Sequence, residues 1–164
     1  MDILALDLGR FTGYAYNRGA EFFCGTWELA TDKEIKAWGL DRQRRIKDPR
    51  IERLCETLTD LGKFDIVVFE DVEFASSTYQ VQLWSSLRAA VWLCATARYW
   101  DCIPVGTLKK FATGSGEATK ELMEKRFWMQ PEFASIKKVD SDDTVDAAWI
   151  WLWAKTNFAR IKLP

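Results

Sequence analysis

Two short apolar runs, each ending on an acid, place the strongest constraint on how this chain folds. The run ILALD at residues 3–7 ends on Asp7, and the run IVVFE at 66–70 ends on Glu70. Continuous apolar runs of this length are typical of strands buried on both faces of a sheet. Because side chains alternate along a strand, each acid lies on the same face as the apolar residues two and four positions before it.

These two acids allow two interpretations. Each acid taken alone fits a strand end that faces water or bonds to the next turn. If the two strands are neighbours, both carboxylates reach the crevice beyond the carboxyl ends of the strands, which is where mixed α/β sheets bind ligands. The occurrence of both acids at strand ends therefore favours a shared ligand-binding site over two unrelated strand ends.

The rest of the pattern predicts one domain over residues 1–164 with an α/β fold. A turn at Asn17-Arg18-Gly19 joins two aromatic-rich runs into a hairpin, so the sheet begins with three antiparallel strands. Two parallel strands complete a five-stranded mixed sheet with helices on both faces. We expect the fourth and fifth strands at 64–70 and 102–106, and helices at about 46–61, 77–100, 106–112, 117–128 and 142–157.

Composition excludes several kinds of site. The 164 residues include no histidine, which removes Ser-His-Asp and Cys-His catalysis and any histidine-ligated metal. The net charge is −1, so nucleic-acid binding needs a local basic patch. We expect no signal peptide and no membrane span. The cysteines show no CxxC spacing and look like small buried residues of a reducing cytosol, which predicts a cytoplasmic protein; they are Cys24, Cys55, Cys94 and Cys102.

A third acidic segment precedes one of the most apolar stretches of the chain. The run DSDDTVD at 140–146 holds four carboxylates and leads directly into AAWIWLWA. Asp143 and Asp146 are three apart, so they share one face of the predicted last helix. Acids near a helix N-terminus favour the helix dipole, and Asp140 or Ser141 suits the N-cap. That interpretation accounts for one or two of the acids and leaves the others unexplained.

A single cause accounts for Asp7, Glu70, Asp143 and Asp146 together. Convergent carboxylates bind hard divalent cations, and Mg²⁺ needs only a few of them because it keeps several of its waters. Two such ions about 4 Å apart can clamp the attacking and leaving oxygens of a phosphodiester without any histidine. The sequence therefore predicts a magnesium site for phosphodiester hydrolysis, in which Mn²⁺ can substitute.

Four segments occur in order along residues 3–154: LALDLGRFTGYA, IVVFEDVEF, LKKFATGSGEATK and DDTVDAAWIWLWA. They resemble the motif blocks of RuvC-type Holliday junction resolvases, within the RNase H-like nuclease superfamily. The resemblance implies an RNase H-like fold and a magnesium-dependent endodeoxyribonuclease that resolves four-way DNA junctions by paired nicks. The small size and tryptophan-rich motifs suit a bacteriophage member. The implied catalytic and metal-binding residues are Asp7, Glu70, Asp143 and Asp146, with Asp142 as an alternative to Asp143.

The resemblance also implies contacts with DNA. Lys109 and Lys120 match two lysines that the family uses near the scissile phosphate, although a solvated helix face explains the same residues. The family places an aromatic wedge three residues after the strand glutamate, and here Glu73 occupies that position. Phe74 or Tyr79 is therefore expected to act as the wedge.

Other segments supply weaker candidates for binding phosphate. The basic segment at 41–50, with Arg44 and Arg45 near its centre, fits a DNA-binding patch, and it fits solvated surface as well. Its other cations are Arg42, Lys47 and Arg50. Gly114 and Gly116 either let the backbone approach phosphate or form a plain turn between two helices.

Paired nicks in a four-way junction require two sites related by a two-fold axis, so we expect a homodimer that binds branched DNA. The predicted helix at 80–99 is a candidate interface, and a fully buried core helix explains its apolar residues equally well. Two other functions stay open: an RNase H-like nuclease on other branched DNA or on RNA, and a non-catalytic nucleic-acid-binding module. Substrate preference at matched salt and an Asp7→Asn variant distinguish them. An actin-like nucleotide-binding protein needs a duplicated domain, for which this chain is too short.

Overall fold

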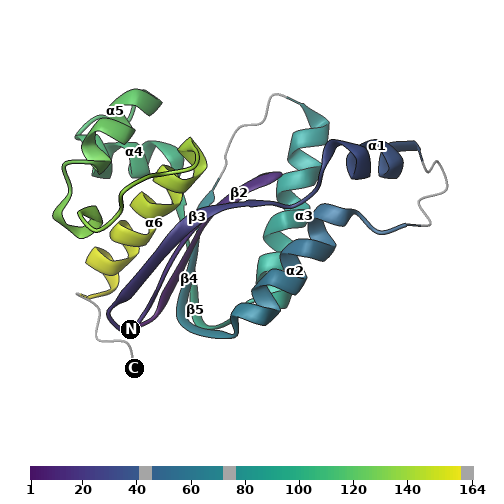
Figure 1. Cartoon of the computed structure of the whole chain (residues 1–164), viewed down its shortest axis with the longest axis horizontal. Coiled ribbons are helices and arrows are strands. Elements are labelled where there is room, and N and C mark those ends of the chain that lie inside the picture. The colour runs from purple at the N-terminus through teal and green to yellow at the C-terminus, as the bar shows by residue number, and fades with distance from the viewer. Residues whose placement is uncertain (41–45, 72–76, 160–164) are drawn as a thin grey trace.

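The chain folds into a five-stranded mixed sheet with helices on both faces (Figure 1). The structure is a computed structural model that describes residues 1–40, 46–71 and 77–159. The strand order is β3-β2-β1-β4-β5, with three antiparallel strands followed by two that run parallel to β1. This order confirms the predicted fold class. The strands are β1 (Ile3–Asp7), β2 (Phe11–Arg18), β3 (Glu21–Glu28), β4 (Lys63–Asp71) and β5 (Thr96–Pro104).

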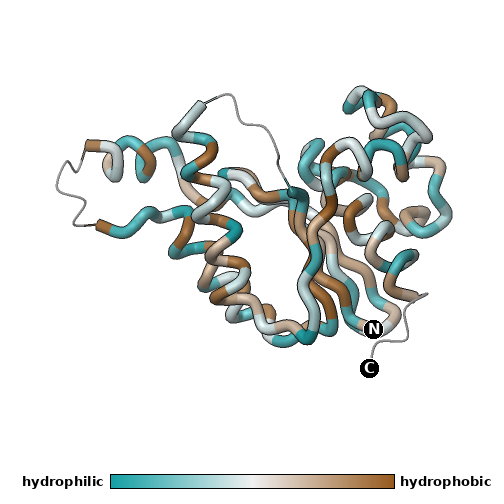
Figure 2. Tube along the Cα trace, turned by 180° about the vertical axis from the view of Figure 1, so that it is seen from behind, coloured by the Kyte–Doolittle hydropathy of each residue, from teal (hydrophilic) through white to brown (hydrophobic). Residues whose placement is uncertain are grey.

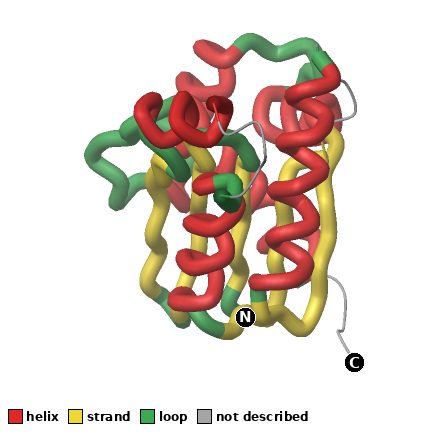
Figure 3. The backbone as a smooth tube through the Cα atoms, turned by 90° about the vertical axis from the view of Figure 1, so that its right-hand side faces the viewer, coloured by secondary structure: helices red, strands yellow, loops and turns green. Residues whose placement is uncertain are grey.

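Strand alternation divides the core into two layers. Ile3, Ala5 and their neighbours on one face pack against α4, α5 and α6, and Leu4 and Leu6 on the other face pack against α2 and α3. Figure 3 looks onto the second helical layer, with the strands behind it. Figure 2 shows hydrophobic and hydrophilic residues mixed along the strands and helices. The continuous apolar runs belong to β1 and β4, as expected for strands at the centre of a sheet covered on both faces. The helices are α1 (Asp32–Leu40), α2 (Pro49–Leu61), α3 (Thr78–Cys94), α4 (Val105–Thr113), α5 (Lys120–Phe127) and α6 (Asp142–Phe158), with a 3-10 turn at Pro131–Phe133.

The boundary between α3 and β5 differs from the prediction. We expected a helix that continues to Trp100 and a strand at 102–106, whereas α3 ends at Cys94 and β5 begins at Thr96. Exposed and half-buried residues alternate along most of β5. Because β5 is an edge strand, it lacks the continuous apolar run that marks β1 and β4, and its aromatic residues extended the apparent helix.

Helix α1 lies in a stretch that the apolar pattern left without structure. None of its residues is buried, so it has no apolar stripe that could have revealed it. Its start carries a capping box, because the Thr31 backbone N–H donates to Glu34 Oε2 (2.7 Å) and the Glu34 N–H donates to Thr31 Oγ1 (3.3 Å). The T-x-x-E pattern at residues 31–34 was the signal that could have predicted this helix.

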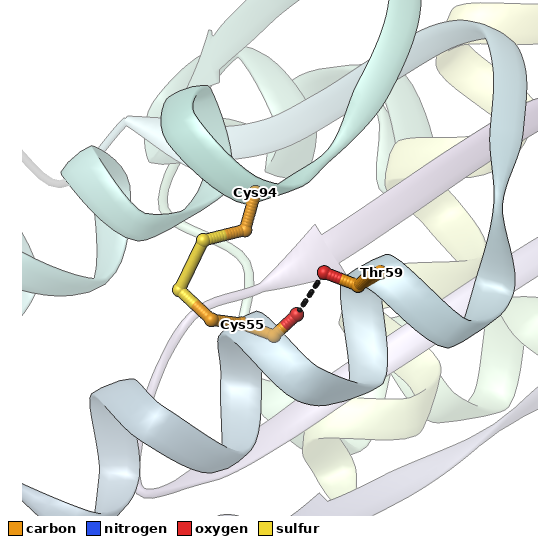
Figure 4. Close-up of a disulfide and its surroundings, with 3 residues drawn as sticks. All are labelled: Cys55, Thr59 and Cys94. Atoms are coloured by element: carbon orange, nitrogen blue, oxygen red, sulfur yellow. Dashed lines mark hydrogen bonds between the residues drawn. A yellow bond between two sulfur atoms is a disulfide. The ribbon is translucent and has the colours of Figure 1, made fainter.

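The prediction of four buried thiols is wrong. Cys55 on α2 and Cys94 at the end of α3 form a disulfide, with Cα atoms 5.2 Å apart (Figure 4). The Cys55 carbonyl accepts a hydrogen bond from the Thr59 hydroxyl at 2.8 Å, one turn further along α2. Cys24 and Cys102 are free thiols, and Cys102 is exposed. The pairing depends on two helices that face each other in space, which the sequence spacing of 39 does not indicate.

In the described part of the chain, no helix combines the length and apolar character needed to cross a membrane.

Candidate active site

The first two predicted acids lie side by side at the carboxyl edge of the sheet. Parallel pairing of β1 with β4 places Leu6 opposite Phe69, so Asp7 and Glu70 occupy the next positions on these adjacent strands. Neighbouring strands are about 4.8 Å apart. Both acids continue the side-chain series that packs against α6 on one face of the sheet. The two strands are therefore neighbours, as the pairing of the acids required.

The N-terminus of α6 is held directly against this edge. Gly13 of β2 pairs with Asp7, and a Cβ added at Gly13 would lie only 1.9 Å from the Asp143 carbonyl oxygen. The missing side chain at Gly13 is thus what allows the first turn of α6 to reach the strand beside Asp7. Position 13 requires glycine for this close approach, although the sequence pattern did not assign it that role.

Threonine and serine hydroxyls fix the same turn to β3. Thr26 Oγ1 forms hydrogen bonds with Ser141 Oγ at 2.6 Å and with Thr144 Oγ1 at 2.8 Å. Ser141 is the N-cap of α6, and its hydroxyl accepts from the Thr144 backbone N–H. These bonds orient α6 so that Asp143 and Asp146 face the sheet. Thr26 is a positioning residue that sequence reasoning missed, since only the fold brings β3 and α6 together.

Burial and mutual repulsion raise the pKa values of the clustered carboxyls. The pKa of Asp7 lies well above its usual range, because of burial first and then the charges of Glu70, Asp146 and Asp143. Burial raises the pKa of Glu70 to about 7, and the charge of Asp146 adds to this rise. The four acids therefore act on one another electrostatically.

The two members of the α6 pair show the same behaviour. Burial raises the pKa of Asp146 to about 6, with the charge of Asp143 adding to it. Burial also raises the pKa of Asp143, and the charge of Lys120 opposes the shift. Asp142 is more exposed, since its side chain is 54% exposed and its Oδ2 lies 3.4 Å from Lys120 Nζ, although its charge also raises the pKa of Asp146. The greater burial of Asp143 favours position 143, and the choice between the two positions stays a prediction.

Two predicted lysines lie beside the acids. Lys109 is on α4 and Lys120 begins α5. The charge of Lys109 lowers the pKa of Glu70 and Asp146, and the charge of Lys120 acts on those two groups and on Asp7. Both ammonium groups therefore reach the cluster from the helices that follow β5.

The turn between α4 and α5 has a conformational explanation. Gly114 is the C-cap of α4 with φ 89°, in the left-handed region that favours glycine, and its N–H donates to Lys110 O. This supports the interpretation as a turn between two helices.

The basic segment is only partly placed. Arg44, Arg45 and the predicted wedge Phe74 lie outside the described residues. Arg50 is 3% exposed, pairs with Asp48 through two of its nitrogens, and donates to the Tyr79 hydroxyl. For Arg50, neither the DNA-binding patch nor the solvated surface holds, because its charge is neutralised inside the α2–α3 packing.

The donor chemistry of the cluster fits a divalent cation. Among the described residues, no three side chains of Asp, Glu or Cys lie close enough together to hold one metal ion as they stand. Four carboxylates against two ammonium groups leave an excess of negative charge when all are ionised. Burial first, and then the charge of Asp146, raises the pKa of Glu70. Carboxylate oxygens are the ligands that Mg²⁺ and Mn²⁺ prefer. A cation at this edge would be held by Asp7, Glu70, Asp143 and Asp146.

Comparison with solved structures relates this fold to known proteins. The chain is similar to Thermus thermophilus RuvC, with a TM-score of 0.60 and 14% identity over 96% of this chain and 97% of that chain. It is also similar to T. thermophilus RuvC in complex with Holliday junction substrate, with a TM-score of 0.63 and 14% identity over 96% of each chain. The chain has the RuvC fold.

The yeast mitochondrial Holliday junction resolvase Ydc2 shares the RuvC fold with this chain at a TM-score of 0.52 and 13% identity, over 90% of this chain and 75% of that chain. No protein-family model and no curated protein sequence matches the chain. At this level of identity the likeness establishes the RuvC fold, and the chemistry has to be argued from the acids themselves.

Proposed function

We propose that this protein is a magnesium-dependent endodeoxyribonuclease that resolves four-way DNA junctions by paired nicks. The observation that carries the proposal lies at the carboxyl edge of the sheet. The carboxylates there are close enough for their charges to act on one another's pKa values; they are Asp7, Glu70, Asp143 and Asp146. The RuvC fold adds support, since one solved neighbour was determined in complex with Holliday junction substrate.

Each group at this edge has a role in phosphodiester hydrolysis. The four carboxylates would hold divalent cations, and these would supply an activated water and neutralise charge on phosphate oxygens. Lys109 and Lys120 lie beside the acids and can pair with the non-bridging oxygens of the scissile phosphate. The carboxylates are half-buried, so water screens these interactions less than it would on an open surface.

We also propose which residues contact the DNA and how many copies of the chain act together. Phe74, Arg44 and Arg45 are proposed to contact the junction, with Tyr79 less suited because its hydroxyl is already bonded to Arg50. Two cuts placed symmetrically in one junction require two active sites, so we propose a homodimer with two-fold symmetry. Mn²⁺ is proposed to replace Mg²⁺, because both prefer oxygen ligands.

A nicking assay on a synthetic four-way junction with Mg²⁺ tests the proposal. The variants are Glu70→Gln, which keeps the shape of the side chain, and Glu56→Gln on the exposed surface of α2 as the matched control. We expect wild type and Glu56→Gln to make paired nicks, and Glu70→Gln to bind the junction without cutting it.

Other outcomes would change the assignment. Equal cutting of four-way and linear DNA at matched salt would remove junction selectivity. Full activity of Glu70→Gln would remove the acids from the chemistry. Junction binding without cutting by the wild type in both Mg²⁺ and Mn²⁺ would favour a binding module on the same fold.

A further inference from the structure

The end of β4 that carries Glu70 is supported by the sheet on one side only. The described β1–β4 ladder ends at the pair Leu6–Phe69. Beyond it, Glu70 and Asp71 pair only with β5, opposite Ile103 and Pro104. Proline has no backbone N–H to donate, so the ladder is weakened at Asp71, the residue next to Glu70. Some other contact has to hold this strand end.

Helix α3 supplies that contact through Arg88. The Arg88 guanidinium forms an ion pair and hydrogen bond with Asp71, the residue next to Glu70. The same guanidinium lies 5.8 Å from the centroid of the Phe69 ring, and Phe69 also meets Trp92 of α3 edge-on at 6.1 Å. The residues on both sides of Glu70 are thus fastened to α3, while Glu70 itself points to the opposite face.

No polar contact fixes the position of the Glu70 carboxylate in the described part of the chain. In the part of the chain that the structure describes, its side chain makes no hydrogen bond and no ion pair. The position of the carboxylate therefore depends on the backbone of β4, and through it on Arg88.

We propose that Arg88 is a positioning residue for the acid cluster, acting through Asp71 on Glu70. This inference rests on the proposed function. Without Arg88, Asp71 is left as an unpaired carboxylate directly beside Glu70, and the strand end loses its attachment to α3. Outer contacts that orient metal ligands commonly change metal affinity or activity by roughly ten- to a hundredfold when removed.

The test uses the full chain and two readouts. The first is junction cleavage by Arg88→Ala, resolved into kcat and KM. The second is the rise in Tm that Mg²⁺ produces without DNA, which does not depend on turnover. Arg88→Lys keeps the charge, and the double variant Asp71→Arg with Arg88→Asp reverses the pair. The matched control is Arg53→Ala, which breaks the Arg53–Glu34 ion pair (2.8 Å) of similar exposure between α2 and α1.

We expect Arg88→Ala to lower kcat by roughly ten- to a hundredfold with little change in KM, and to reduce the Mg²⁺-induced rise in Tm. The lysine variant and the charge reversal should each recover part of both readouts, and Arg53→Ala should change neither. If Arg88→Ala lowers Tm but keeps the wild-type response to Mg²⁺ and the wild-type kcat, Arg88 is merely structural. A wild type that cuts no junction overturns the proposed function instead, while the Mg²⁺ response still decides the role of Arg88.

Discussion

Replacing Glu70 by glutamine should stabilise the metal-free protein while abolishing the response to metal. The pKa of Glu70 rises from 4.5 to about 7, mainly because burial disfavours the charged form. When folding raises the pKa of a group, the protonated group contributes its full stability at pH values below the pKa of the unfolded state. That contribution is lost as the pH rises through the pKa of the folded state. Metal-free wild type should therefore lose stability between about pH 4.5 and pH 7, the range set by those two values.

The size of the effect follows from the shift. One pKa unit corresponds to about 1.4 kcal/mol, so the ionised Glu70 costs the folded protein roughly 3 kcal/mol above pH 7. Glutamine keeps the shape without the charge, and it also relieves the repulsion on Asp7. For a chain of 164 residues, 3 kcal/mol corresponds to a rise in Tm of roughly 6–12 °C.

Thermal unfolding in EDTA from pH 4 to pH 8 measures this difference. We expect Glu70→Gln to melt above wild type at pH 8 and to match it near pH 4. Adding Mg²⁺ should raise the Tm of wild type and leave that of the variant nearly unchanged. A Glu70→Gln protein that melts below wild type at pH 8, or a difference that does not change with pH, would refute the electrostatic reasoning.

Two further predictions concern how the site is built and how the helices are held. Gly13→Ala should displace the first turn of α6, because its Cβ would lie 1.9 Å from Asp143 O. We expect the free energy of unfolding, measured by chemical denaturation, to fall by about 1–3 kcal/mol, and the Tm response to Mg²⁺ to weaken. The control Gly39→Ala, which has open space at its Cβ, should change neither quantity. Reducing the Cys55–Cys94 disulfide, which closes a separation of 39 residues, should lower the free energy of unfolding by about 4 kcal/mol without affecting nicking. Equal stability with and without reductant would show that the bridge contributes nothing.

The fold and the acid cluster were predictable because both depend on local patterns. Continuous apolar runs marked β1 and β4, and the residues that end them are necessarily at the strand ends. The spacing of Asp143 and Asp146 put both on one face of α6 whatever the helix packed against. The charges of Glu70, Asp146 and Asp143 act on the pKa of Asp7, as expected of neighbouring groups, and the roles of the four acids as site residues stay a prediction.

The features that could not be predicted depend on contacts between distant segments. Nothing near Gly13 in the sequence indicates that the Asp143 backbone will pack on it, and nothing near Cys55 points to Cys94. Arg88 sits within a helix whose apolar residues dominate the pattern, so its ion pair with Asp71 is visible only in the fold. Arg50 shows the converse, since a charge in a basic run became buried once Asp48 and Tyr79 closed around it.

The most direct measurement is the position of a bound metal. Crystals of the full chain grown with Mn²⁺ and measured for anomalous scattering would locate the ion independently of any activity. We predict Mn²⁺ at the carboxyl edge of the sheet, coordinated by oxygens of Asp7, Glu70 and the α6 pair, and absent from crystals of Asp7→Asn. Mn²⁺ bound only elsewhere, or no ion at this edge under saturating Mn²⁺, would contradict the account.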